Sequence, residues 1–305
     1  MTTPSEVTPE HSRGESTSIR RDPGAGLSPE HTARYWGREG LLDTVLGALA
    51  TAGKDLDRLS VEDLAATDQF HGGGRPATLR LAELAGLAGL AGVREGADGA
   101  PRQVLDVGGG LGGPARTLAH RFGCVVTTID LTPSYVEVAR ELTRRVGLQD
   151  RVTHHVGDAI DLPFAERTFD LVWTMNTGMN IADKEALYRG FHRVLRPGGT
   201  LAFQEPMAGE QSPPHFPLMW AVDASMSFLL PAGELRAVVA AAGFDEVVWE
   251  LVTETTSSGN APPPPPHAVQ RLIMGDERLA AIAAAQRRNL DEDRIATVHA
   301  VFRKR

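Results

Sequence analysis

The feature that most constrains this chain is a short apolar run that ends in a glycine-rich turn, VLDVGGGLGG at residues 104–113. An apolar run bounded by turn residues predicts a buried strand. Glycine in the turn lets a ligand approach the backbone without meeting a side chain. Gly108, Gly110 and Gly113 fit the spacing GxGxxG, and Gly108, Gly110 and Gly112 fit GxGxG. The turn therefore predicts a nucleotide-like ligand but leaves its class open.

Short apolar runs alternate with helical patterns along the rest of the chain, which is typical of βα units in a parallel sheet. Strands are expected at residues 103–107, 125–129, 152–156, 171–174, 201–204, 247–252 and 297–302, and helices at 114–122, 133–146 and 184–195. The predicted fold class is α/β, with a Rossmann-like sheet of seven strands.

Three parts are expected along the chain. Residues 1–26 are polar and poor in large apolar side chains, which predicts a disordered tail. Residues 27–100 show helical patterns and are expected to form an N-terminal cap, ahead of a catalytic domain at 101–305. Two long connections, 207–231 and 253–293, interrupt the alternation and are expected to be lid insertions. Helices are expected within the cap at 60–66 and 76–90.

Composition excludes several kinds of partner. A net charge of −8 offers no basic surface for a nucleic-acid backbone. The single cysteine, Cys124, rules out an internal disulfide, and no Cys/His spacing resembles a zinc site, so no metal is expected. Without a long apolar run or the apolar segment of a signal peptide, a cytoplasmic location without a membrane span is expected. The sequence does not decide between a monomer and a homo-oligomer.

Three features further along the chain narrow the choice of ligand, whereas Asp130 fits either class of nucleotide-like ligand. Asp130 ends the second strand, where an acidic side chain can accept ribose hydroxyls. GDA at 157–159 follows the third strand, FDLVW at 169–173 forms the fourth, and LRPGG at 195–199 precedes the fifth. In this order they resemble the class I S-adenosylmethionine (SAM)-dependent methyltransferases. Within that family the pattern is most similar to a branch that includes sarcosine/dimethylglycine N-methyltransferases and quinone and sterol C-methyltransferases.

The resemblance, which covers residues 35–305, implies SAM as cofactor and a set of cofactor-binding residues. Asp106 and the glycine turn would hold the methionyl end, Asp130 the ribose, Leu131 one face of the adenine and Asp158 its amino group. The implied set is Asp106, Gly108, Gly110, Gly112, Asp130, Leu131, Asp158 and Ala159.

The catalytic candidates are fewer, because a bound SAM carries an already activated methyl group and a base is optional. Glu205 could accept a proton or offset cationic charge, although it also reads as a turn carboxylate. Asn176 stands where the similar branch often has histidine. His71, in the loop FHGGG, resembles a family loop that covers the methionyl group. Tyr35 and His31 in the cap complete the set of candidates. The alternative to a catalytic role is a position in the apolar core for Tyr35 and a solvated helix face for His31.

Apolar side chains gather in the first lid insertion and after the fourth strand, which predicts an apolar substrate cavity. They are Phe216, Met219, Trp220, Met226, Phe228, Leu229, Met175 and Met179. The expected reaction is methyl transfer to an apolar small molecule, a specialised metabolite, with carbon methylation of a prenyl or terpenoid group favoured over O- or N-methylation. The alternatives are N-methylation of small amines such as glycine derivatives, an NAD-dependent oxidoreductase, and a SAM-binding protein without catalysis.

Overall fold

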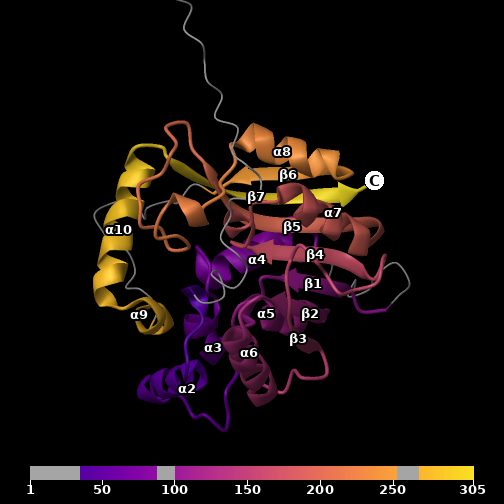
Figure 1. The fold of residues 1–305 in the computed structure, drawn as a ribbon. Coiled ribbons are helices and arrows are strands. Elements are labelled where there is room, and N and C mark those ends of the chain that lie inside the picture. The colour runs from indigo at the N-terminus through magenta and orange to yellow at the C-terminus, as the bar shows by residue number, and fades with distance from the viewer. Residues whose placement is uncertain (1–34, 88–99, 253–267) are drawn as a thin grey trace, which may run out of the picture.

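The computed structural model describes residues 35–87, 100–252 and 268–305 (Figure 1). The strands are β1 Gln103–Val107, β2 Val125–Asp130, β3 Val152–Val156, β4 Phe169–Met175, β5 Leu195–Ala208, β6 Phe244–Leu251 and β7 Ile295–Lys304. The helices are α2 Leu41–Thr51, α3 Val61–Asp68, α4 Gly74–Leu84, α5 Gly113–Phe122, α6 Pro133–Arg145, α7 Lys184–Val194, α8 Ala232–Ala241, α9 Ala268–Met274 and α10 Asp276–Asp291, with short 3-10 turns η1 Gly178–Asn180 and η2 Ala224–Met226. None of the helices in these ranges has the length and apolar character needed to cross a membrane.

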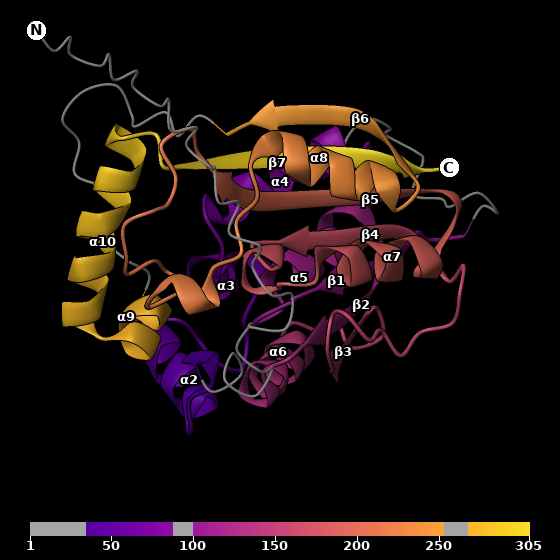
Figure 2. The same cartoon turned by 45° about the horizontal axis from the view of Figure 1, so that its top comes forward.

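The strands form one seven-stranded sheet in the order β3-β2-β1-β4-β5-β7-β6. The first five strands run parallel, and β7 runs antiparallel to both β5 and β6. The chain changes direction across the sheet between β1 and β4, and in such sheets ligands bind at the carboxyl ends of the strands on either side of that point. Figure 2 shows that α10 stands at the end of the sheet to which β4 points. The expected Rossmann-like fold of seven strands is confirmed.

Side chains that alternate along each strand build two separate apolar cores, one on each face of the sheet. In β1, Val104 packs with α4 and α5, whereas Leu105 packs with α7 and α8. Figure 2 shows α7 and α8 on the near face of the sheet, with α4 and α5 behind it. Both faces of the central strands β1, β4 and β5 are therefore buried, which explains why these strands read as nearly continuous apolar runs.

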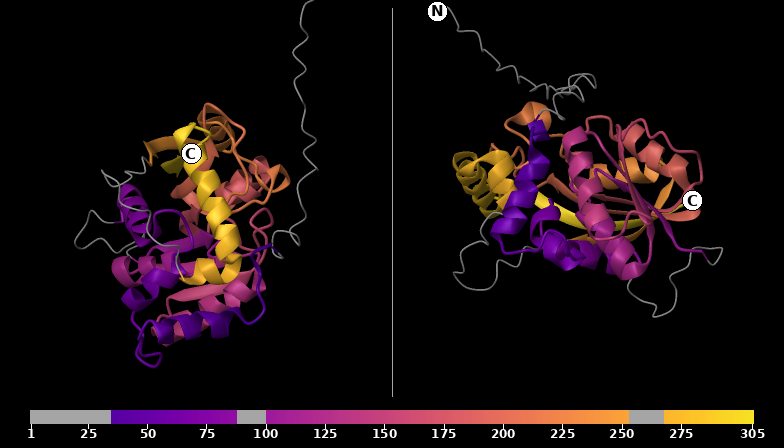
Figure 3. Two further views of the ribbon diagram at one scale, coloured as in Figure 1. Left: turned by 90° about the vertical axis from the view of Figure 1, so that its left-hand side faces the viewer. Right: turned by 90° about the horizontal axis from the view of Figure 1, so that it is seen from below.

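The cap helices α2 and α3 do not pack on the sheet. Their buried residues, among them Leu49 and Leu64, join Leu142 of α6 and Met274 of α9 in a third apolar cluster. Figure 3 shows α2 and α3 beside α9 and α10. The helix α4, which the sequence assigned to the cap, instead packs on the sheet with α5.

Part of the sequence-based organisation needs correction. The sequence analysis placed no helix between residues 207 and 293, yet α8, α9 and α10 lie there. The sequences of α8 and α10 are rich in alanine, which leaves few large apolar residues to mark a helical face. The sequence of α9 spans only seven residues, which is too short to distinguish a helix from a strand by its pattern. Residues 1–26, the start of the cap and residues 253–267 of the second insertion lie outside the described ranges.

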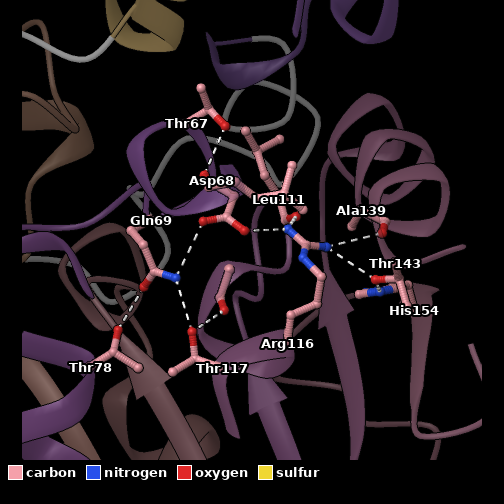
Figure 4. Close-up of polar contacts among 12 residues, drawn as sticks. Thr67, Asp68, Gln69, Thr78, Leu111, Arg116, Thr117, Ala139, Thr143 and His154 are labelled. Carbon is pink, nitrogen blue, oxygen red and sulfur yellow. Dashed lines mark hydrogen bonds and ion pairs between the residues drawn. The ribbon is translucent and has the colours of Figure 1, made fainter. Parts of the chain in front are cut away.

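A buried ion pair joins the cap to the core (Figure 4). Arg116 of α5 donates from Nη2 to Asp68 Oδ2 at the end of α3, at 2.8 Å, and both side chains are buried. The same nitrogen donates to the carbonyl oxygen of Leu111 in the glycine turn, at 2.6 Å. The other terminal nitrogen donates to Ala139 O at 3.2 Å and to Thr143 Oγ1 at 3.1 Å in α6. One guanidinium therefore joins the cap, the glycine turn and α6.

Hydrogen bonds extend this network towards α4. Gln69 donates from Nε2 to Asp68 Oδ1 and to Thr117 Oγ1, at 3.3 Å in both cases, and its Oε1 accepts from Thr78 Oγ1 at 2.8 Å (Figure 4). The backbones also come close at this point: a Cβ on Gly113 would lie 2.3 Å from the carbonyl oxygen of Asp68. Gly113 therefore serves the packing of the cap against α5.

We predict that Arg116→Met lowers the free energy of unfolding by about 3–5 kcal/mol, because it leaves the buried carboxylate of Asp68 without its opposite charge. The double variant Asp68→Leu/Arg116→Met should lose less, since neither charge then remains. Urea denaturation measures both values. As a control, Arg189→Met removes an exposed ion pair with Glu185 and should leave stability unchanged. A double variant that loses as much as Arg116→Met alone would contradict this role of the pair.

Candidate active site

A cavity of about 960 Å³ lies at the carboxyl ends of β1, β2 and β4. The glycine turn and the ends of β2 and β3 line one part of it. The cap loop at residues 70–77, the loop after β4, the lid residues 218–220 and one face of α10 line the rest. The turn expected to bind a nucleotide-like ligand and the lid expected to cover a substrate therefore belong to one cavity.

The three glycines of the GxGxG pattern have left-handed backbones, with φ of 72° at Gly108, 52° at Gly110 and 80° at Gly112. A Cβ on Gly108 would lie 2.0 Å from Thr177 Oγ1, and one on Gly112 would lie 2.7 Å from Arg116 Nη1. A Cβ on Gly110 would meet nothing within 4 Å. Gly110 is therefore the open position, and the other two permit close internal packing.

Asp130 closes the glycine turn from the end of β2. Its Oδ2 accepts the backbone N–H of Gly110 at 2.8 Å, and its Oδ1 accepts that of Thr132 at 2.9 Å. Burial raises the pKa of the carboxyl group, and the two backbone N–H bonds oppose that rise. Because each carboxylate oxygen can accept more than one hydrogen bond, Asp130 can still receive hydroxyl groups from the cavity, which it lines.

Asp106 offers a different kind of group. It is 2% exposed, it lines the cavity, and its Oδ2 has no hydrogen-bond partner among the described residues. Burial, with the charge of Asp130 as a second cause, raises the pKa of this carboxyl group to about 7. A buried carboxylate without a partner is costly, so a cationic group in the cavity would stabilise it. This fits the methionyl end of SAM, which carries an ammonium and a sulfonium.

The remaining predicted cofactor residues lie around the same compartment. Leu131, Asp158 and Ala159 line the cavity, and Asp158 Oδ1 also accepts the backbone N–H of Ile160 at 3.1 Å. Of the eight residues that the resemblance implied, only Gly112 lies outside the cavity lining.

Glu205 does not line this cavity. The neighbours of Glu205 in β5 line the cavity, and its own carboxylate lies on the opposite face of the sheet. There it accepts backbone N–H groups from Thr177 at 3.0 Å, Gly178 at 2.7 Å and Met179 at 3.2 Å. Burial raises the pKa of Glu205, and these bonds oppose the rise. The geometry indicates a carboxylate that holds the loop after β4, rather than one that faces the methyl group.

Tyr35 also lies outside the cavity lining. Its hydroxyl donates to the carbonyl oxygen of Met219 at 3.1 Å, and the Arg278 guanidinium lies 4.4 Å from the centre of its ring. Burial raises the pKa of Tyr35. The side chain therefore fastens the lid to the cap, and the neighbouring Trp36 reaches the cavity in its place.

His71 and Asn176 line the cavity, as their candidate roles require. His71 Nε2 lies 3.2 Å from Gln69 Oε1 and 3.0 Å from Thr78 Oγ1, so the network of Figure 4 extends to the imidazole. His31 lies outside the described residues.

About half of the apolar residues expected at the substrate site reach the cavity. Met175, Met179, Met219 and Trp220 line it. Phe216, Met226 and Leu229 pack within the lid, and Phe228 borders a much smaller space beside Glu205. The indole N–H of Trp220 donates to Ser227 Oγ at 3.1 Å, so the polar group of this side chain already has a partner inside the lid.

The sequence analysis missed the wall that α10 provides. Its lining residues are Leu279, Ile282, Ala283, Gln286, Asn289 and Leu290. They recur every three or four positions, so the signal of one helical face was present in the sequence.

Residues 105–203 match a family model described as a methyltransferase domain. Over 106 residues the chain is 41% identical to methyltransferase GfsG of Streptomyces halstedii, covering 35% of this chain and 38% of the relative. Over 116 residues it is 37% identical to a sarcosine/dimethylglycine N-methyltransferase of Halorhodospira halochloris, covering 38% and 41%. The matched region thus spans less than half the length of these relatives.

Solved structures extend the likeness to nearly the whole chain. A geranyl diphosphate C-methyltransferase of Streptomyces coelicolor A3(2), in complex with S-adenosyl-L-homocysteine, aligns with a TM-score of 0.62 at 17% identity, covering 93% of this chain and 100% of that one. The [4+2]-cyclase SpnF aligns with a TM-score of 0.62 at 21% identity, covering 92% and 97%. At these identities the likeness shows a shared fold. The expected methyltransferase domain is confirmed over residues 105–203, and with it SAM as the cofactor.

We predict that the affinity for S-adenosylhomocysteine rises with pH through about pH 7. The raised pKa of Asp106 means that a proton occupies its carboxyl group at lower pH, whereas the ligand's ammonium group favours the ionised form. Affinity should change by up to about tenfold per pH unit below the pKa and level off above it. Calorimetry at about pH 6, 7 and 8 measures this change. Asp106→Asn should bind weakly with a flat profile, and a flat profile in the unmodified protein would contradict the assignment.

Proposed function

We propose, from the methyltransferase domain at residues 105–203, that this chain is a class I SAM-dependent methyltransferase and that it transfers the methyl group of SAM to a neutral, largely apolar small molecule. The observation that carries the proposal is the single cavity that joins the glycine turn to an apolar compartment between the lid and α10. A cofactor at the turn and a substrate in that compartment would meet beside the loop after β4.

The cofactor end supports the assignment of four residues. We assign Asp106 and the open backbone at Gly110 to the methionyl group, Asp130 to the ribose and Leu131 to the adenine. When bound, SAM supplies an electrophilic methyl group on a sulfonium. The residues of this chain then have to align the accepting atom with that methyl group and exclude water from the site.

His71 is the lining residue that we assign to proton removal, when the accepting atom loses a proton during the reaction. Its ring is held by Gln69 and Thr78, so its position depends on the contact between cap and core. We assign Glu205 and Tyr35 to positioning, because the first holds the loop after β4 and the second holds the lid.

The charge of the cavity argues against a substrate that carries an anionic group. The charged residues in its described lining are five aspartates and one arginine, with no lysine: Asp68, Asp106, Asp130, Asp158, Asp183 and Arg75. Arg75 is already paired with Glu62, at 2.8 Å. A carboxylate or a diphosphate would therefore find little compensation for its desolvation. This argues against glycine derivatives and against a prenyl diphosphate.

The apolar lining also bears on the accepting atom. We propose carbon methylation of a prenyl or terpenoid group in specialised metabolism as the first candidate, because the apolar lining suits an alkene and the ring of Trp220 can stabilise a developing cation. O-methylation and N-methylation are the alternatives, and the similar relatives and structures include all three kinds.

We predict that the protein transfers labelled methyl from SAM to neutral prenylated or aromatic compounds, and not to sarcosine or geranyl diphosphate. A screen of such compounds with radiolabelled SAM measures this. Trp220→Ala should lower kcat/KM for the accepted compound by about tenfold or more while SAM affinity stays unchanged, because Trp220 belongs to the lid and is not among the residues assigned to the cofactor. Phe216→Ala is the matched control, since this side chain packs in the lid without lining the cavity.

Turnover of sarcosine alone would contradict the substrate class and leave methyl transfer intact. SAM binding without turnover of any compound would favour the SAM-binding protein without catalysis. Binding of NAD in place of SAM would contradict the proposed function as a whole.

A further inference from the structure

Asn176 lies in the cavity wall directly after β4, with a backbone φ of 56°. Its backbone N–H donates to the carbonyl oxygen of Gln204 at 2.8 Å. Its side-chain Oδ1 accepts from Gln204 Nε2 at 2.6 Å. Both the backbone and the side chain of Asn176 are therefore fixed by one residue of β5.

The orientation of the Gln204 amide follows from its other neighbours. Its Nε2 lies 3.0 Å from the carbonyl oxygen of Gly72, which can only accept, so the amide nitrogen must face that way. Its Oε1 lies 2.7 Å from His299 Nε2. Gln204 is 1% exposed, and both of its N–H groups and its oxygen have partners. The amide therefore cannot turn over without breaking three hydrogen bonds.

His299 supplies the start of this chain of hydrogen bonds. Since Gln204 Oε1 can only accept, His299 Nε2 must carry a proton. The ring is 3% exposed, and burial lowers the pKa of the imidazole, which favours its neutral form. Its Nδ1 has no hydrogen-bond partner in the described ranges. The direction of donation is thus fixed from His299 to Gln204 and from Gln204 to Asn176.

The side-chain Nδ2 of Asn176 remains at the end of this series of hydrogen bonds. Because Asn176 Oδ1 already accepts from Gln204, its Nδ2 carries the N–H donors that remain for the cavity. The hydrogen bonds within residues 35–87, 100–252 and 268–305 include none from Nδ2, and Asn176 is only partly buried. A donor is therefore presented where the cofactor and substrate compartments meet.

We propose that Asn176 Nδ2 donates a hydrogen bond to an oxygen of the substrate, and that His299 and Gln204 act as positioning residues that fix the direction of this donor. The substrate class becomes a neutral, largely apolar molecule with a carbonyl, ether or hydroxyl oxygen. This inference rests on the proposed function, because it takes the compartment beside Asn176 as the substrate site.

Selectivity follows from the cost of leaving the donor unpaired. A hydrocarbon that covers Asn176 Nδ2 removes it from water without replacing its hydrogen bond, whereas an oxygen at the same place compensates that loss. A single neutral hydrogen bond of this kind corresponds to about a fivefold to tenfold difference in affinity.

A simpler reading is that asparagine stands here only because it tolerates a left-handed backbone. The variant Asn176→Gly separates the two readings, since glycine accepts this backbone and removes the amide. Asn176→Asp adds a second test, because the carboxylate keeps the shape and the acceptor but loses the donor.

The experiment measures the binding of α-tetralone, a ketone, and tetralin, the matching hydrocarbon, to the full-length protein with and without S-adenosylhomocysteine. The unmodified protein should prefer the ketone by about fivefold to tenfold, and the carbonyl infrared band of the bound ketone should shift to lower wavenumber. Asn176→Gly and Asn176→Asp should lose both signals. His299→Phe should reduce the preference, whereas a purely structural loss would weaken both probes alike.

Equal affinity for the two probes in the unmodified protein, failure of both to bind, or a preference that survives in Asn176→Gly would overturn the inference. The binding of S-adenosylhomocysteine is read separately in the same samples. Its absence would contradict the proposed function, and a ketone preference lost in Asn176→Gly would still assign the donor.

Discussion

The ion pair between Asp68 and Arg116 is the contact on which the arrangement of the site depends. Two buried charges are tolerated only when they are paired and further hydrogen-bonded, and Arg116 reaches the cap, the glycine turn and α6 at once. The pair therefore fixes where the cap meets the core. Since residues 70–77 form one wall of the cavity, the shape of the site depends on this contact.

The glycine turn serves packing as much as binding. A side chain at Gly108, Gly112 or Gly113 would overlap Thr177, Arg116 or the Asp68 backbone, and only Gly110 faces open space. Packing against neighbouring residues of the protein, and not the ligand, therefore requires most of these glycines. This explains why the pattern fits the motifs of two different ligand classes. The ligand class depends instead on Asp106, Asp130 and the segments that follow the next strands.

The sequence predicted the sheet well, because the strands depend on local patterns, and it brought most of the implied cofactor residues to one cavity. The strands at 103–107 and 152–156 have the predicted bounds, and seven of the eight implied cofactor residues line the cavity. The orientation of Glu205 could not be predicted, because both faces of the sheet are buried and the apolar pattern does not show which way a strand residue points. The contact of Gln204 with His299 joins residues far apart in sequence, and no local signal predicts it.

Amide hydrogen exchange with S-adenosylhomocysteine tests most directly whether the cap and the glycine turn form one cofactor site. Binding should slow exchange at residues 105–113 and 130–132 and, in the same titration, at the cap residues 69–75, because the cap loop closes on the occupied turn. NAD at the same concentration should protect neither region. Protection confined to the turn with an unchanged cap, or protection by NAD in place of S-adenosylhomocysteine, would contradict this result.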